Sequence, residues 1–300
     1  MSFDSYAAEF MAEDRRRSEA LRAGALRDMR EGASRMWRRV VATTIALTIA
    51  YFVLSIPLAW YQSRLIYWND VTAMTDLSMP KGWAIREYVS QDADVQYAAY
   101  VHAGEKKRPT VVYLHGRGEG FGIFEHNVAA YVQRGWTVVV PEYPGFAGLS
   151  GEPNEHVIKA YMGKVYDDLL ERGVDPRLLL IHGNSLGAGP ALQLAQFPHG
   201  FLFLSAPVGD MKKLVARYIP YYPTMFLRDR WDNGARAATR YRAPAMLIHA
   251  ADDMVVPIDQ GRDLARRGRI PMRTYAEGGH AIADLDGFVT YESGRFAYGG

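Results

Sequence analysis

A serine flanked by small residues follows an apolar stretch in the middle of the chain. The segment Gly183-Asn184-Ser185-Leu186-Gly187 lies between the apolar run 178–181 and a predicted helix. A nucleophilic serine must project from a tight strand-to-helix turn, and glycines two positions before and after it remove Cβ atoms that would clash. The start of a helix also directs backbone N–H groups toward developing negative charge. This spacing predicts Ser185 as a nucleophile.

Two later loops carry an acid and a base that could serve this nucleophile. Asp253 lies in HAADDMVVP (249–257), after the apolar run AMLIH, and His280 lies in the glycine-rich segment EGGHAIAD (277–284). An acid in such a loop can orient a histidine and stabilise its imidazolium form. Asp252 is the alternative acid, and the spacing to the following Val-Val-Pro run favours Asp253. The order serine, aspartate, histidine along the chain is the one that a strand–serine–helix hydrolase requires.

A third loop, His115-Gly116-Arg117-Gly118, follows the apolar run TVVYL. A loop at this place supplies one donor of an oxyanion hole, and the residue after the nucleophile supplies the other. We therefore expect the backbone N–H groups of Arg117 and Leu186 to be the donors. We expect His115 to shape the loop rather than to catalyse. The Arg117 side chain is expected in solvent, with pairing to a substrate carboxylate or phosphate as the alternative.

The elements that must position these loops alternate between strands and helices. Such alternation predicts a mainly parallel sheet covered on both faces. The first two predicted strands form a hairpin. Predicted strands cover Trp83–Ser90, Val95–His102, Thr110–His115, Thr137–Val140, Leu178–Ile181, Phe201–Leu204, Ala245–His249 and Met272–Tyr275, and predicted helices cover Phe121–Arg134, Glu155–Arg172 and Leu186–Gln196.

One segment is long and apolar enough to cross a membrane. Val40–Tyr61 contains no charged residue, and its 22 residues would span roughly 33 Å as a helix, enough for the hydrocarbon core of a bilayer. Trp37 precedes the segment, and Trp60, Tyr61, Tyr67 and Trp68 lie at or after its end, as in interfacial aromatic belts. A buried core helix and a cleaved signal peptide are the alternatives. An uncleaved signal anchor fits better, because a 39-residue charged leader would be unusually long.

The residues before this segment are rich in arginine. The tail 1–39 holds nine arginines and seven acidic residues, so it carries the whole formal net charge of +2. We expect it to be a solvated helix or a disordered arm whose main role is topogenic. Six arginines lie shortly before the apolar run, and only Arg64 and Lys81 follow it closely. The positive-inside rule then places the N-terminus in the cytoplasm and residues 62–300 outside it, in the periplasm if the source is bacterial. The predicted organisation is tail 1–39, transmembrane anchor 40–61 and catalytic domain 62–300.

Composition excludes several functional classes. A net charge of +2 over 300 residues disfavours a nucleic-acid-binding protein, which would carry a strong basic excess. The chain has no cysteine, so disulfides, thiolate metal sites and a cysteine nucleophile are excluded. We expect no metal and no organic cofactor.

Taken together, the motifs resemble those of the α/β-hydrolase superfamily, and more narrowly its small membrane-tethered branch with one N-terminal anchor and a minimal lid. The resemblance covers about residues 62–290 and implies an α/β-hydrolase fold, the triad Ser185, Asp253 and His280, and the oxyanion donors named above. The family commonly has a small or amide residue where Arg117 stands and a glycine where Ala250 stands. The motifs that carry the resemblance are HGRG (115–118), EYPGFAGLSGEP (142–153), GNSLGAGPA (183–191), WDN (231–233), HAADDMVVP and GGHAIAD.

The leading functional hypothesis is hydrolysis of carboxylic or thioesters of lipid-like or acylated substrates at a membrane surface, through an acyl-enzyme on Ser185. A serine peptidase or aminopeptidase on the same triad is one alternative, and a non-catalytic membrane-tethered binding protein is another. The insert between the strands FLFLS and AMLIH contains the aromatic run 218–227. That run either packs over the sheet, roofs an acyl site or dips into lipid.

Overall fold

The computed structural model describes residues 3–69, 73–74, 78–88 and 94–281, with side chains from residue 11 onward. The predicted strand end at Ser90 and residues 282–284 of the GGHAIAD motif lie outside these ranges. The chain divides into two compact units, Met1–Leu58 and Ala59–Gly300. We describe each unit by itself.

A single helix, α1 (Phe3–Tyr67), runs through the N-terminal unit and ends inside the second. Within it lies one stretch apolar enough to cross a membrane, with a mean hydropathy of 2.0. The hydroxyl groups of Thr44, Thr48 and Ser55 each donate to the backbone carbonyl four residues earlier, at 2.8–2.9 Å. These bonds satisfy three hydroxyl groups of the apolar stretch within the helix itself, which suits a segment surrounded by lipid.

The second unit is built on an eight-stranded sheet with the order β1-β2-β4-β3-β5-β6-β7-β8. β1 pairs antiparallel with β2, and β2 with β4, while the other neighbours are parallel. The predicted hairpin and the mainly parallel sheet are therefore confirmed. The strands are β1 (Trp83–Tyr88), β2 (Tyr97–His102), β3 (Thr110–Leu114), β4 (Thr137–Glu142), β5 (Leu179–Asn184), β6 (Phe201–Ser205), β7 (Ala245–Ala250) and β8 (Met272–Tyr275).

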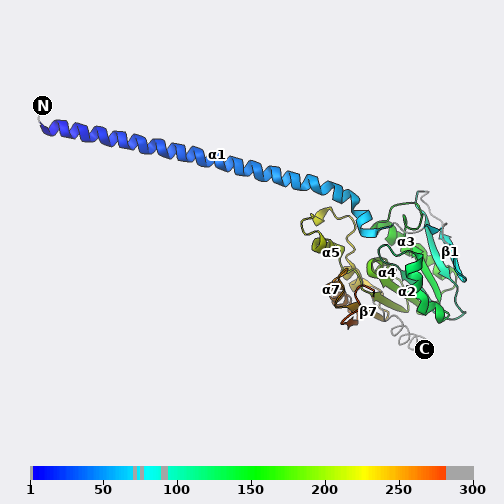
Figure 1. Cartoon of the computed structure of the whole chain (residues 1–300). Coiled ribbons are helices and arrows are strands. Elements are labelled where there is room, and N and C mark those ends of the chain that lie inside the picture. The colour runs from blue at the N-terminus through cyan, green and yellow to red at the C-terminus, as the bar shows by residue number, and fades with distance from the viewer. Residues whose placement is uncertain (1–2, 70–72, 75–77, 89–93, 282–300) are drawn as a thin grey trace. The chain divides into compact units, whose positions relative to one another are not determined.

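Helices cover both faces of this sheet (Figure 1). One core cluster joins the sheet to α3, α4, α6 and α7, and the second joins it to α2. Helices α5, α6 and α7 were not predicted, because they are short or mostly polar and bury only a few side chains each. The α-helices are α2 (Phe121–Gln133), α3 (Glu155–Glu171), α4 (Ala188–Leu194), α5 (Met211–Tyr218), α6 (Asn233–Thr239) and α7 (Ile258–Gly268), and the 3-10 turns are η2 (Pro176–Leu178), η3 (Ser185–Gly187) and η4 (Thr224–Phe226).

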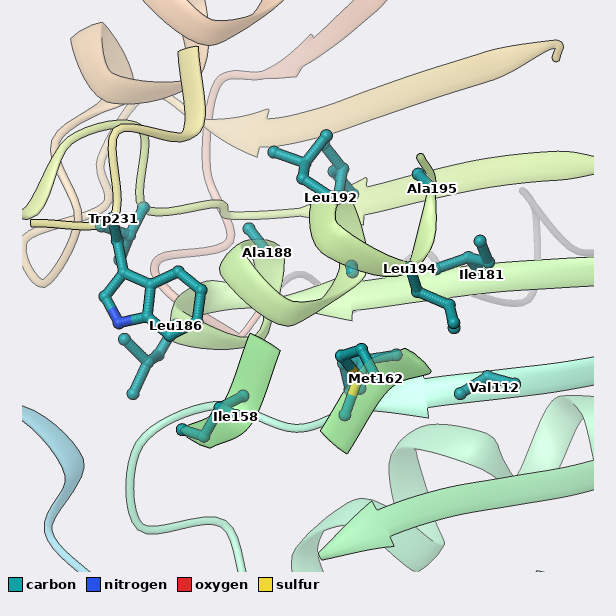
Figure 2. Packing of buried hydrophobic residues seen from close by; sticks show 14 of the residues in the cluster. Val112, Ile158, Met162, Ile181, Leu186, Ala188, Leu192, Leu194, Ala195 and Trp231 are labelled. Atoms are coloured by element: carbon teal, nitrogen blue, oxygen red, sulfur yellow. The ribbon is translucent and has the colours of Figure 1, made fainter. Parts of the chain in front are cut away.

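The packing around α4 shows how the core supports the middle of the sheet. Trp231 is fully buried and lies with Leu186 and Ala188 in the cluster drawn in Figure 2. Gly189 of α4 is needed there, because a Cβ atom on it would overlap the indole ring of Trp231. The parallel register sets Leu114 of β3 opposite Gly183 of β5. The carboxyl ends of the central strands therefore meet at one edge, where sites form in open α/β sheets.

Candidate active site

Ser185 lies at a sharp turn between β5 and α4. Its φ of +54° is in the left-handed region, which a residue with a side chain rarely adopts. A Cβ atom on Gly183 would be 2.5 Å from the Cβ of Ala191, and one on Gly187 would overlap the Leu114 carbonyl oxygen. Both glycines are therefore required because neighbouring atoms approach their Cα atoms closely. The packing around the two glycines holds the serine between them in its strained conformation.

His280 lies between Ser185 and Asp253. Its Nε2 is 2.9 Å from Ser185 Oγ, and its Nδ1 is 2.8 Å from Asp253 Oδ2. The serine and the aspartate are buried, whereas about a quarter of the His280 side chain (26%) is exposed. An imidazole in this position can take the serine proton on one nitrogen while the carboxylate holds the other. The structure thus brings together the three residues that sequence reasoning singled out from three separate loops.

The Asp253 carboxylate is held by several donors. Its Oδ1 accepts the backbone N–H groups of Val255 and Val256, both at 2.8 Å, and its Oδ2 lies 3.2 Å from Nε2 of the buried His249. Burial alone would raise the pKa of Asp253, but the hydrogen bonds from His249, His280 and Val256 outweigh it and hold that pKa well below its usual value. The carboxylate therefore stays ionised next to the His280 ring.

Asp252, the alternative acid, has a different position. Its two carboxylate oxygens accept the backbone N–H groups of Gly278 and Gly279, at 3.3 and 2.8 Å. It therefore ties the loop that carries His280 to the end of β7, without contacting the imidazole. Neighbouring aspartates have separate tasks here: one contacts the histidine, and the other holds the backbone before it.

The HGRG loop packs directly against the serine turn. A Cβ atom on Gly116 would lie 2.6 Å from Glu119 Oε1 and 3.1 Å from the Cβ of Ser185, so a larger residue would force these side chains to shift. Arg117 follows Gly116 in the loop, and Leu186 follows the serine. Their assignment as backbone oxyanion donors stays a prediction that this proximity supports.

The Arg117 side chain does more than extend into solvent. Its Nε donates to the carbonyl of Leu65 in the last turn of α1, at 3.0 Å, and its guanidinium lies over the Trp68 ring, 4.8 Å from the centroid. An arginine at a helix C-terminus complements the unpaired carbonyls and the negative end of the helix dipole. The loop of the predicted oxyanion hole is therefore attached to the segment that follows the apolar part of α1.

His115 is fully buried and both of its ring nitrogens are engaged. Nδ1 is 3.0 Å from the Gly116 carbonyl oxygen, and Nε2 forms an ion-pair contact of 2.9 Å with Glu142 Oε1 that is not a well-aligned hydrogen bond. Burial opposes the imidazolium form, but Glu142 outweighs it and raises the pKa of His115. This histidine supports the loop through its contacts with Gly116 and Glu142, in line with the structural role expected of it.

Sequence reasoning missed two supporting residues, Glu119 and His249. Glu119 accepts hydrogen bonds from the Asn184 amide and, at 2.9 Å, from the Tyr113 hydroxyl, which ties the HGRG loop to the residue before the nucleophile. The signals were faint: a carboxylate directly after HGRG, and a histidine four residues before Asp253. Within the part of the chain that the structure describes, no group of three or more His, Cys, Asp or Glu side chains could hold a metal ion.

Comparison with known proteins identifies the fold. A sequence family described as the alpha/beta hydrolase fold matches residues 109–230. The esterase Pf2001 of Pyrococcus furiosus is similar over 71% of this chain and 88% of its own, with a TM-score of 0.57 at 15% identity. The chain has the α/β-hydrolase fold. An acylaminoacyl peptidase of Pyrococcus horikoshii is also similar over 69% of this chain and 39% of its own, with a TM-score of 0.53 at 16% identity.

Relatives by sequence include lysophosphatidylserine lipases. The lysophosphatidylserine lipase ABHD12 of Danio rerio is 28% identical over 60% of this chain and 51% of its own length, and that of Rattus norvegicus is 28% identical over 65% and 53%. An uncharacterized protein of Mycobacterium tuberculosis is 27% identical over 78% of this chain and 86% of its own. The chain spans about half the length of the curated lipases that it matches.

Proposed function

We propose that this α/β hydrolase cleaves carboxylic or thioester bonds of lipid-like or acylated substrates. The observation that carries the proposal is the His280 ring, which lies within hydrogen-bond distance of both Ser185 Oγ and Asp253 Oδ2. The similarity to lysophosphatidylserine lipases supports a lipid ester as the substrate class.

In this proposal Ser185 Oγ attacks the acyl carbonyl while His280 Nε2 takes its proton. The backbone N–H groups of Arg117 and Leu186 stabilise the oxyanion, and Asp253 stabilises the imidazolium. His280 then protonates the leaving alcohol or thiol, and the acyl group stays on Ser185. Water, deprotonated by His280, releases the acid and restores the serine. The chemistry of these side chains needs no redox partner.

Fluorophosphonate labelling and ester turnover of the purified full chain test the proposal. We expect both in the native protein, and Ser185→Ala should abolish labelling and lower ester turnover by about 10⁴-fold or more, since triad serines typically contribute that much. Undiminished turnover in Ser185→Ala would remove this serine from the mechanism. Absence of labelling in the native protein would favour the non-catalytic alternative.

A peptidase on the same three residues is tested by a panel of p-nitrophenyl esters and aminoacyl anilides. An aminopeptidase needs an acidic group to bind the substrate amine, and Glu119 near the serine turn is already engaged by Asn184 and Tyr113. We therefore expect the esters to be turned over much faster than the anilides. Preference for the anilides would reverse this assignment.

We further propose that residues 40–61 anchor the chain in a membrane, with residues 62–300 outside the cytoplasm. The support is the uncharged run within α1 and the excess of arginine on its N-terminal side. An alkaline phosphatase fused after Gly300 should be active, and a fluorescent protein that folds only in the cytoplasm should be dark there. The opposite pattern would place Ser185 on the cytosolic side.

A further inference from the structure

Exposed apolar side chains gather on the insert between β6 and β7 and on the loop after Asp253. Tyr221 is 84% exposed, Met225 68% and Met254 81%. The Tyr218 hydroxyl donates to the backbone carbonyls of Met254 and Val255, at 2.6 and 2.7 Å, and so joins the two segments into one surface. We call this surface the insert face; it comprises Tyr218, Ile219, Tyr221, Met225, Met254 and Val255.

Buried side chains of the insert hold it against the core, so the exposure of its other apolar side chains does not come from a loosely attached loop. Tyr222 and Leu227 are buried, at 7% and 3% exposure, and Leu227 is part of the main core. The run 218–227 thus turns a minority of its large side chains inward and the rest outward. Simple packing over the sheet accounts for the first group and leaves the second unexplained.

The insert also contacts the end of the N-terminal helix. The Gln62 amide donates to the Phe226 carbonyl at 3.2 Å and accepts the Arg228 N–H at 2.8 Å. The two residues before Gln62 are exposed aromatics, Trp60 at 81% and Tyr61 at 55%. Tryptophan and tyrosine in such places lie at the headgroup level of a bilayer. The insert is therefore attached to the point where the chain leaves its apolar span.

The charges beside the insert face are mostly positive. The insert carries the exposed basic residues Lys212, Lys213, Arg217, Arg228 and Arg230; its Asp229 is buried, and its exposed Asp232 pairs with Arg267. An apolar surface on a segment with an excess of exposed lysine and arginine matches a membrane with anionic headgroups, which attract each basic group near the surface. A protein partner would need a complementary surface that is both acidic and apolar. The contact between the insert and the end of the N-terminal helix favours a membrane over such a partner.

We propose that the insert face is a second membrane contact, docked on the anionic surface of the bilayer that holds the N-terminal helix. This inference rests on the proposed membrane anchoring. Val255 of the insert face donates its N–H to Asp253, so docking brings lipid to the loop of the proposed catalytic acid. An ester whose acyl chain lies in the bilayer then meets the site from the lipid side.

Site-directed fluorescence in vesicles tests this proposal directly, because the chain has no cysteine. Met225→Cys gives a single site for a nitrobenzoxadiazole label on the full chain, reconstituted in phosphatidylcholine–phosphatidylglycerol vesicles that contain a lipid with a nitroxide on its acyl chain. The matched control is Leu170→Cys, at the end of α3, where an exposed apolar side chain (41%) lies toward the amino ends of the strands. We expect strong quenching at position 225 and little at position 170. Equal quenching at the two positions would overturn the proposal.

Charge reversal tests the lipid class. Arg217→Glu and Arg228→Glu should each weaken docking of the insert face by roughly fivefold or more in anionic vesicles, as expected for removing one basic group near the surface. In vesicles of phosphatidylcholine alone the substitutions should have little effect. Quenching that ignores both the substitutions and the lipid charge would overturn the anionic part of the proposal.

Turnover separates this proposal from the proposed function. Tyr221→Ser with Met225→Ser should slow hydrolysis of a long-chain ester embedded in vesicles and leave a soluble short-chain p-nitrophenyl ester unaffected in detergent. A quenched label on an inactive protein would refute the esterase and retain docking. An active esterase with an unquenched label would refute docking and retain the esterase.

Discussion

Asp253 and Asp229 are equally buried, each with 5% of its surface exposed, yet the pKa values of their carboxyl groups are shifted in opposite directions. Asp253 faces two histidines and two backbone N–H groups, and its pKa is held low. Burial raises the pKa of Asp229, which accepts the Tyr67 hydroxyl at 2.9 Å and the Glu155 N–H at 3.0 Å. The negative charge of Glu155 adds to the rise, and the two hydrogen bonds do not reverse it.

The difference shows that the donors around a buried acid decide whether its pKa falls in spite of burial. At the edge of the sheet they keep an ionised acid beside His280. At the helix end the same residue type joins α1 to the insert, because Tyr67 also accepts the Trp231 indole N–H at 3.0 Å. One aspartate is arranged for chemistry and the other for holding two segments together.

The sharpest way to break this comparison is activity. Asp253→Asn should lower kcat/KM for a p-nitrophenyl ester by about 10⁴-fold, because an amide cannot hold the imidazole in the required tautomer. Asp229→Asn should stay within about threefold, since it touches none of the proposed reacting groups. Similar losses in the two variants would show that the helix junction is part of the reaction machinery.

Stability sharpens the comparison from the other side. Trp231→Ala should destabilise the protein by about 3–5 kcal/mol, because it empties a fully buried site against α4 and removes the donor to Tyr67. Trp60→Ala is the matched control, since Trp60 is 81% exposed, and it should change stability by less than about 0.5 kcal/mol. Denaturant unfolding of the full chain in detergent measures both. A stable Trp231→Ala variant would mean that the junction contributes little to the fold.

The two aspartates should also differ in their pH dependence. A lowered pKa contributes stability above the unfolded value, about 3.9, and loses it only as the pH falls through the folded value. The deficit of Asp253→Asn should therefore be nearly constant between about pH 4 and about pH 7. Asp229 has a raised pKa, so its ionisation costs stability as the pH rises from the unfolded to the folded value. The stability of Asp229→Asn should accordingly rise relative to that of the native protein over that pH range. Parallel pH curves for the two variants would contradict the opposite shifts.

The smallest expected effect belongs to Asp252. An asparagine there keeps one acceptor for the Gly278 and Gly279 N–H groups, so Asp252→Asn should lower kcat by no more than about tenfold. The same ester assay, run beside Asp253→Asn, measures it. If Asp252→Asn proved the more damaging of the two, the acid of the site would have to be reassigned.

Much of the fold and the site was predictable because local patterns carry them. Glycines at 183 and 187 indicate a tight turn in which a side chain at either position would clash. Apolar runs such as TVVYL and FLFLS predict buried parallel strands. The predictions missed α5, α6 and α7, which are short and bury few large apolar side chains. They placed the Arg117 side chain in solvent, and the residue is exposed, but they missed its contacts with Leu65 and Trp68, which lie about fifty residues earlier.

The sequence by itself determined the order of the candidate catalytic residues along the chain. A serine between glycines comes first, then an aspartate and then a histidine, each in a loop after a predicted strand. Only the tertiary structure decided the distances of 2.8 and 2.9 Å that bring the three together, because they depend on the register of separate strands. It also decided the opposite pKa shifts of Asp253 and Asp229. His280, which together with His249 lowers the pKa of Asp253, and Tyr67 and Glu155, which contact Asp229, are distant in the chain from these aspartates and become their neighbours only when the sheet and its helices pack.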